Sequence, residues 1–336
     1  MTILMTGLCE KGADQIWKQC NDAMYAQGVT WLEEAAYAGD AEAWFFLGHC
    51  YSWGDGAVGF NEKKAYECYL RGASAGSARA VLGALRAGQY DEQMKQSARY
   101  SIEESYRQVR DAAEMGDVYA AWQMGEAVEW EDLADYMPQT ESAREQCLFW
   151  YERAADGGII PAMVKMGKCC QNGTYREKDE KEALRWANQC AASGEVWGLF
   201  QMGEHYRQEE DWEAAFQYDY AAAKQGSSRA MLYLGQMYLN GQGTERDIQA
   251  AVQALEGAAA RNEAESFEEL GNLFYQDELV ERDDEKAFYW YGKAYAAGIK
   301  EAALPLARLY LRPSDEQDTV RAEKLLREAA GIETDG

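Results

Sequence analysis

The side chains that most often bind metals or act as nucleophiles are scarce in this chain and are not grouped. Its 336 residues include two histidines, His49 and His205, which stand far apart along the sequence. A metal site or a catalytic dyad needs such side chains close together. No phosphate-binding glycine loop, H-E-x-x-H helix or S-x-x-K serine motif occurs. We therefore predict no catalytic residues, no metal, no cofactor and no enzymatic activity. A hydrolase of unrecognised type, acting through separated carboxylates, is the weakest alternative.

The cysteines form no C-x-x-C pair and follow no regular period, so the sequence indicates neither a zinc site nor a disulfide framework. They are Cys9, Cys20, Cys50, Cys68, Cys147, Cys169, Cys170 and Cys190. A free cysteine behaves as a small apolar residue. We expect these side chains to be buried parts of the core.

The chain is strongly acidic, because 58 Asp and Glu residues against 33 Lys and Arg residues give a formal net charge of -25. Such a charge repels nucleic-acid phosphates and anionic membranes, so we expect no direct nucleic-acid partner and no membrane contact. No apolar run reaches the roughly 18 residues of a spanning helix, and no basic residue precedes the short N-terminal apolar stretch, as it would in a secretory signal. We expect a cytoplasmic protein whose charge serves solubility or suits a basic partner.

A leucine or methionine followed by glycine recurs along the whole chain, at Gly48, Gly83, Gly125, Gly167, Gly203, Gly235 and Gly271, with Leu306-Ala307 as an eighth copy. A small residue lies five positions before each of these glycines, and before Ala307 in the eighth copy. Three positions after the glycine stand mostly aromatic or apolar residues. Small, apolar and aromatic residues at this spacing predict one face of a helix, which we call helix A.

A second helix, helix B, follows each copy and ends in an alanine pair or a near equivalent. The start of this pair lies thirteen residues before the next Leu-Gly glycine in nearly every copy, for example from Ala35 to Gly48 and from Ala222 to Gly235. The loop from helix A to helix B varies in length. A stack of hairpins whose neighbours must meet at one fixed angle would show this asymmetry.

These motifs resemble the Sel1-like repeat, a relative of the tetratricopeptide repeat; the clearest copies are residues 43–76 and 230–257. The resemblance covers about residues 28–331 and implies an all-α fold, a right-handed superhelical α/α solenoid. We expect an N-terminal helical cap and half repeat at residues 1–40, eight repeats in one continuous solenoid at 41–331, and a tail at 332–336. The resemblance also implies a scaffold or adaptor for other proteins.

Three copies depart from the pattern. The second has a long loop before its helix B and Gln108 at the aromatic position, and the fifth has no glycine in the turn that ends its helix A, residues 207–211. The eighth carries Pro305 inside its first helix, which is tolerable near a helix start. A bulky side chain in place of Gly203 should overpack the crossing of the two helices.

The first helices of such repeats usually line the concave side of the stack, and we predict an open groove there, without a closed centre. Two columns of helix A share this face, because they stand three residues apart. We expect exposed Phe46 and Tyr233 to serve as anchors among polar neighbours. The predicted partner-binding residues are Phe46, His49, Gln123, Glu126, Lys165, Lys168, Gln201, Glu204, Tyr233, Gln236, Glu269 and Asn272. His205 belongs to an apolar column, so we expect it to be largely buried.

The partner in this prediction is another protein or an extended peptide. Two alternatives stay open. The first is an acidic inhibitor or immunity-type protein that neutralises one basic target. The second places the main contact on the long acidic loop at residues 127–146 instead of the groove; an acidic loop that only faces solvent fits the sequence equally well.

Overall fold

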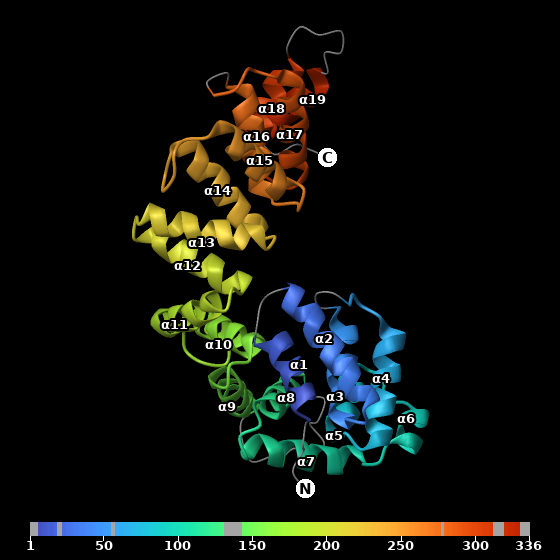
Figure 1. Cartoon of the computed structure of the whole chain (residues 1–336). Helices are drawn as coiled ribbons and strands as arrows, with labels where there is room; N and C mark the ends of the chain where they lie inside the picture. The colour runs from blue at the N-terminus through green and yellow to red at the C-terminus, as the bar shows by residue number, and fades with distance from the viewer. Residues whose placement is uncertain are drawn as a thin grey trace. The chain divides into compact units, whose positions relative to one another are not determined.

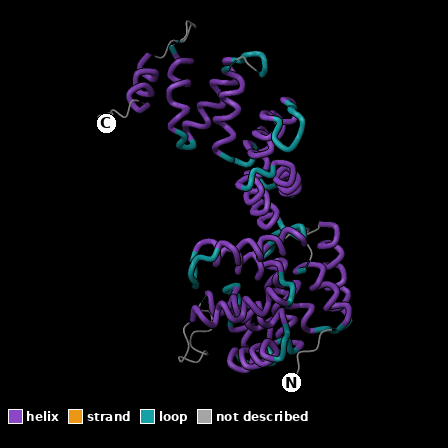
Figure 2. Tube along the Cα trace, turned by 90° about the vertical axis from the view of Figure 1, so that its left-hand side faces the viewer, coloured by secondary structure: helices purple, strands orange, loops and turns teal. Residues whose placement is uncertain are grey.

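The computed structural model describes residues 6–18, 22–54, 58–130, 143–276, 279–311 and 319–329. Over these ranges the chain consists of helices and loops, without a strand (Figure 2). None of the helices described is both long and apolar enough to cross a membrane. The predicted all-α class is confirmed.

The chain divides into two compact units, residues 1–198 (unit 1) and 199–336 (unit 2), and their helices are labelled in Figure 1. Unit 1 contains α1 (Gly7–Trp17), α2 (Asp22–Tyr37), α3 (Ala41–Trp53), α4 (Glu62–Ala75), α5 (Ala78–Arg86), α6 (Glu92–Ser97), α7 (Ile102–Glu114), α8 (Val118–Glu129), α9 (Ala143–Asp156), α10 (Ile160–Asn172) and α11 (Glu180–Ala192). α12 (Val196–Gln208) begins at the boundary, and unit 2 continues with α13 (Trp212–Lys224), α14 (Ser228–Asn240), α15 (Ile248–Ala259), α16 (Ala264–Tyr275), α17 (Asp284–Ala296), a 3-10 turn (Lys300–Ala302), α18 (Ala303–Tyr310) and α19 (Thr319–Ala329). A single continuous solenoid over residues 41–331 stays a prediction.

Successive helices pack as hairpins of one helix A and one helix B, for example α3 with α4 and α14 with α15. The extra helix α6 lies in the long loop of the second repeat, and α7 then supplies helix B of that repeat.

The turn from helix B to the next helix A is the same hydrogen-bonded structure in repeat after repeat. Ser77 N–H donates to Gly72 O, Ser227 N–H to Ala222 O and Ile299 N–H to Ala294 O, in each case back to the first position of the alanine pair or of its equivalent. The residue directly before the N–H donor has a positive φ, as at Gly76 and Gly226. This is the Schellman arrangement, which needs glycine or asparagine at that position. One shared turn explains the fixed spacing of thirteen residues.

Most of the glycines of helix A lie where the following helix B crosses closest, whereas Gly83 and Gly167 face Tyr69 on α4 and Trp197 on α12. A Cβ atom added to Gly48 would stand 2.6 Å from the ring of Tyr69, and one added to Gly235 would stand 2.6 Å from Leu255 Cγ. Gly203 meets the carboxylate of Asp219 in the same way, at 2.5 Å. The predicted overpacking therefore has a specific neighbour at each crossing.

Two departures from the repeat pattern have simple structural solutions. Glu210, in place of the missing glycine of the fifth repeat, adopts the left-handed conformation with φ 59°. Pro305 lies in the first turn of α18, directly after the 3-10 turn, where it removes no hydrogen bond of a helix interior.

The concave side of unit 1 is filled instead of open. Trp17 of α1 packs with its ring centroid 5.1 Å from Phe46 on α3 and 5.8 Å from Trp122 on α8, and Tyr119 Oη donates to Asp14 Oδ1 at 2.6 Å. Phe46 is completely buried. The predictions of an open centre and of an exposed Phe46 are therefore wrong for this unit, because the N-terminal helix covers the face on which Phe46 lies.

The cysteines of the described ranges are buried, as predicted: Cys9, Cys50, Cys68, Cys147, Cys169, Cys170 and Cys190. Cys20 lies outside the described residues. Burial raises the pKa of the Cys147 thiol to about 12, which keeps it protonated and unreactive.

Candidate functional site

A pocket of about 240 Å³ opens in unit 1 at the ends of three A helices. α3 continues five residues past Gly48 to Trp53, and α8 continues four past Gly125 to Glu129. α5 stops at Arg86, three residues past its glycine, and the chain turns away at Gly88 with φ 68°. The turn that α5 lacks leaves a space between its longer neighbours, which we call the α5 pocket.

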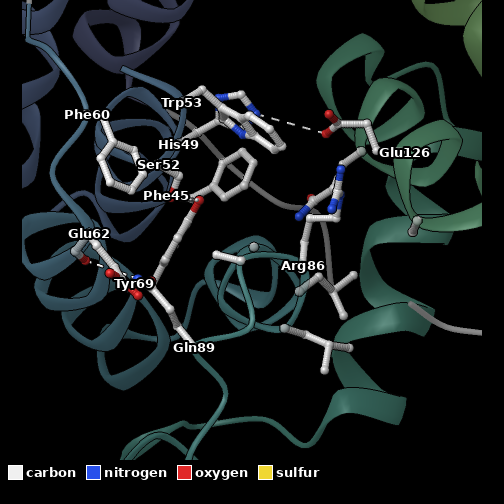
Figure 3. Close-up of a pocket in the computed structure, with 16 residues that line it drawn as sticks. Phe45, His49, Ser52, Trp53, Phe60, Glu62, Tyr69, Arg86, Gln89 and Glu126 are labelled. Atoms are coloured by element: carbon white, nitrogen blue, oxygen red, sulfur yellow. Dashed lines mark hydrogen bonds and ion pairs between the residues drawn. The ribbon is translucent and has the colours of Figure 1, made fainter. Parts of the chain in front are cut away.

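Aromatic side chains make much of the wall of the α5 pocket (Figure 3). Phe45 from α3 and Tyr69 from α4 lie at its base and are buried. At its mouth, Trp53 is 48% exposed and Phe60 is 70% exposed. Large exposed aromatic side chains around a hollow are typical of a contact surface.

Arg86 lies between two tryptophan rings at this mouth. Its guanidinium carbon is 5.2 Å from the ring centroid of Trp53 and 4.4 Å from that of Trp130, which is 57% exposed. Guanidinium groups bind favourably over tryptophan faces. The stacking fixes an arginine and two exposed tryptophans in one place; together with Phe60 we call them the aromatic rim.

Several polar atoms around the pocket are buried without a hydrogen-bond partner. Gln123 Nε2 donates to Arg79 O and Gln89 Nε2 donates to Glu62 O, each at 3.0 Å. Their Oε1 atoms and both ring nitrogens of His49 are left without one. A buried polar group with no partner costs about 1–3 kcal/mol, and a bound ligand could supply the missing bonds.

His49 is neutral in this site. Burial, and secondarily the nearby Arg86, lowers its pKa to about 3. Its Nε2 stands 4.0 Å from Glu126 Oε2, so at neutral pH this contact is neither an ion pair nor a hydrogen bond. Ser52 Oγ donates to Tyr69 Oη at 3.2 Å instead of to His49. A histidine of such low basicity does not activate a serine at neutral pH.

Three of the predicted binding residues of unit 1 come together in this pocket, namely His49, Gln123 and Glu126. Phe46 lies behind it, under Trp17. Lys165 on α10 forms an ion pair with Glu129, and Lys168 is exposed on the same helix.

The predicted residues of unit 2 form a half-buried series of polar contacts. Gln236 Nε2 on α14 donates to Glu269 Oε1 on α16 at 2.8 Å, and Asn272 Oδ1 accepts from Tyr291 Oη at 2.8 Å. Gln201 Nε2 donates to Glu204 Oε2 at 3.4 Å. The guanidinium of Arg207 stacks over the ring of Tyr233, with its carbon 3.7 Å from the ring centroid. Tyr233 is therefore half-buried, whereas the prediction had it exposed. His205 is also half-buried, less than predicted.

Arg86 is the residue that the sequence reasoning missed, although a signal was present. It stands in the column three positions after the glycine, where the other seven residues are aromatic or apolar. Trp53 and Trp130 gave no periodic signal, because each stands at the end of its helix A, outside the repeated face.

Most of the long acidic loop at 127–146 lies outside the described residues, which end at 130 and resume at 143. Glu129, before the gap, is bound to Lys165 and accepts a hydrogen bond from Tyr151 Oη at 2.7 Å. As for metals, no group of three His, Cys, Asp or Glu side chains that could hold an ion occurs among the residues described.

The family model of the Sel1 repeat matches residues 23–40, 41–77, 118–159, 160–195, 228–262, 268–299 and 301–330. The chain belongs to the Sel1 repeat family. Members of this family generally act as scaffolds in protein interactions.

Solved structures show the same solenoid fold. Protein c5321, a protective antigen in uropathogenic Escherichia coli strains, aligns with a TM-score of 0.66 at 21% identity, over 90% of this chain and 64% of its own. A Sel1 repeat protein from Oxalobacter formigenes aligns with a TM-score of 0.54 at 22% identity, over 76% of this chain and 100% of its own. The uncharacterized protein NMB1327 of Neisseria meningitidis is 28% identical over 156 residues, 46% of this chain and 30% of that protein. The chain thus spans under two thirds of c5321 and of NMB1327.

Two long stretches lie between the matched repeats, residues 78–117 and 196–227. The first contains α5 with Arg86, and the second contains the buried pair of Arg207 and Asp219. These are the second and fifth repeats, which already departed from the pattern in sequence. The α5 pocket therefore forms where the chain is least like a standard repeat.

Proposed function

We propose that this chain is a non-catalytic scaffold that holds a segment of a partner protein at the aromatic rim and the α5 pocket. The observation that carries this proposal is the stacking of Trp53 and Trp130 on Arg86, with Phe60 at the same pocket, each aromatic side chain about half exposed or more. Tryptophan and arginine dominate the binding energy of protein interfaces. Leaving them in water has a free-energy cost that a partner would remove.

The chemistry of the pocket supports binding over catalysis. His49 stays neutral at physiological pH, and the Ser52 hydroxyl donates its hydrogen bond to Tyr69 Oη. Neither pairs with the other as a base and a nucleophile would. The family is generally one of scaffolds, which agrees with this interpretation.

We also propose the polar series of unit 2 as a second contact surface for an extended segment. Gln236 and Glu269 hold each other in place across two repeats. Side chains fixed in this way lose little conformational freedom when they bind. Their present hydrogen bonds make them weaker anchors than the aromatic rim.

The experiment is affinity capture from native lysate with three forms of the full chain: the unmodified chain, the double variant Trp53→Ala/Trp130→Ala, and Phe149→Ala. Phe149 is a matched control, because it is 49% exposed in the same unit and does not line the pocket. We expect one partner to be retained by the unmodified chain and by Phe149→Ala. The double variant should bind it about 30-fold more weakly or worse, since loss of a hot spot costs about 2 kcal/mol or more. Equal retention by the double variant would refute the proposal.

The net charge of -25 supports a second candidate, an acidic inhibitor of one basic target. Electrostatic attraction of this kind is screened within about 8 Å at physiological salt. Affinity that falls steeply between low and high salt would favour the inhibitor. Affinity that is insensitive to salt but lost in Trp53→Ala/Trp130→Ala would favour the aromatic rim.

A further inference from the structure

The size of the α5 pocket limits what can enter it. About 240 Å³ lies among four helices and is lined by side chains of α3, α4, α5 and α8. This space is below the range of pockets for drug-sized ligands, which begin at roughly 300 Å³. It suits one large side chain of a partner, inserted between Trp53 and the buried rings of Phe45 and Tyr69.

The pocket contains unpaired hydrogen-bond acceptors, so a ligand that pairs with them must donate a hydrogen bond. Gln89 Oε1 and Gln123 Oε1 are acceptors without partners, and a neutral His49 offers one further acceptor nitrogen. Gln123 and His49 are only 6% and 7% exposed, so water does not reach them freely. A ligand without an N–H or O–H group would leave these atoms as unsatisfied as before.

The charges around the pocket give no preference to a charged side chain of either sign. Arg86 and Glu126 both line it (Figure 3), so a charged side chain of the partner would meet one like and one opposite charge. Burying a charged group without a partner of its own has a larger free-energy cost than burying a neutral group that is hydrogen-bonded.

We propose that the α5 pocket takes a tryptophan or tyrosine side chain of the partner, with its N–H or O–H donating to the acceptors at Gln89, Gln123 or His49. This inference rests on the proposed function. Aromatic pairs in tilted or edge-to-face geometry add about 0.5–1.5 kcal/mol to the burial of their area. Buried tryptophan and tyrosine also need an acceptor for their polar atom, and the pocket supplies unused ones.

The test uses the full chain and small amino-acid probes in calorimetric titrations. N-acetyltryptophanamide and N-acetyltyrosinamide should bind with a Kd of about 1 mM or tighter. The 1-methylindole analogue and N-acetylphenylalaninamide lack the donor and should bind about 2- to 10-fold more weakly. N-acetyllysinamide should bind more weakly still.

Two variants show whether the probes enter the pocket itself. Ala87 is half-buried at the pocket wall, so Ala87→Leu should fill the space and abolish binding. His49→Phe removes the ring nitrogens without breaking any hydrogen bond and should reduce the preference for donor-bearing probes. Phe149→Ala should bind like the unmodified chain.

Equal affinity for the methylated and unmethylated indole, tighter binding of the lysine probe, or no binding of either donor-bearing probe would overturn the inference. The proposed function would then still stand if the captured partner depended on Trp53 and Trp130. If capture were independent of the rim while the probes bound as expected, the proposed function would fail and the pocket would be a small-molecule site.

Discussion

His49 should make unit 1 less stable in acid, and replacing it with phenylalanine should remove this sensitivity. The ring is buried and neutral, and neither nitrogen has a hydrogen-bond partner. His49→Phe therefore deletes no hydrogen bond and keeps an aromatic ring beside Trp17, Trp122 and Phe45. The variant separates the effect of the imidazole's proton from the effect of packing.

The size and sign of the effect follow from the two pKa values of His49. In the folded chain its pKa is lowered from 6.5 to about 3. Above pH 6.5 the ring is neutral in both states, so its titration contributes nothing to stability. Below that pH only the unfolded chain gains the proton, and folding stability is lost until the pH reaches about 3. At pH 4.5 the loss is roughly 3 kcal/mol, from about 1.4 kcal/mol per pKa unit.

Urea unfolding of the unmodified chain and of His49→Phe at pH 7.5 and pH 4.5 measures this difference. The phenylalanine variant should gain about 3 kcal/mol relative to the unmodified chain between the two pH values. Glu126 and Arg86 stay in both proteins, so their contributions to stability largely cancel in the comparison. A difference in stability that is the same at both pH values would refute the argument that His49 is held neutral by burial.

The remaining predictions concern packing and charge in unit 2. Gly235→Ala should lower the free energy of unfolding by about 1–3 kcal/mol, because the new Cβ would meet Leu255 Cγ at 2.6 Å. Gly292→Ala, with nothing within 4 Å, should raise it by up to about 1 kcal/mol; urea unfolding that gives both variants the same sign would contradict the crossing geometry. Burial raises the pKa of Asp219 to about 6 despite its pairing with Arg207, so the stability due to this group should fall as the pH rises from about 4 to 6. The double variant Asp219→Leu/Arg207→Met should not show that loss. Its free energy of unfolding at pH 7 should equal that of the unmodified chain or exceed it by about 1–4 kcal/mol. A double variant that is less stable in thermal unfolding would contradict this.

Local spacing predicted the repeats well because the repeats are built from local contacts. Most of the Leu-Gly glycines lie where helix A and helix B of one hairpin cross, and the alanine pair or its equivalent leads into the same hydrogen-bonded turn. Both features join residues close in sequence. Periodicity is sufficient to read such contacts.

Whether the groove is open or covered was harder to predict, because the residues that cover it are distant in sequence. Phe46 lies on the face that the spacing indicates, yet Trp17 from the N-terminal helix covers it, and Tyr119 reaches back to Asp14. The pocket itself arises from the early end of α5. Helix length at one irregular repeat does not follow from the regular ones.

The most direct test of the central claim is photo-crosslinking of the full chain to its partner in cells. A benzoylphenylalanine placed at Phe60 would stand on the aromatic rim, whereas one at Met115 would be just as exposed, since both native side chains are 70% exposed. We predict a covalent adduct with a partner protein from position 60 and none with that partner from position 115. The same adduct from both positions, or one from position 115 alone, would contradict binding at the aromatic rim.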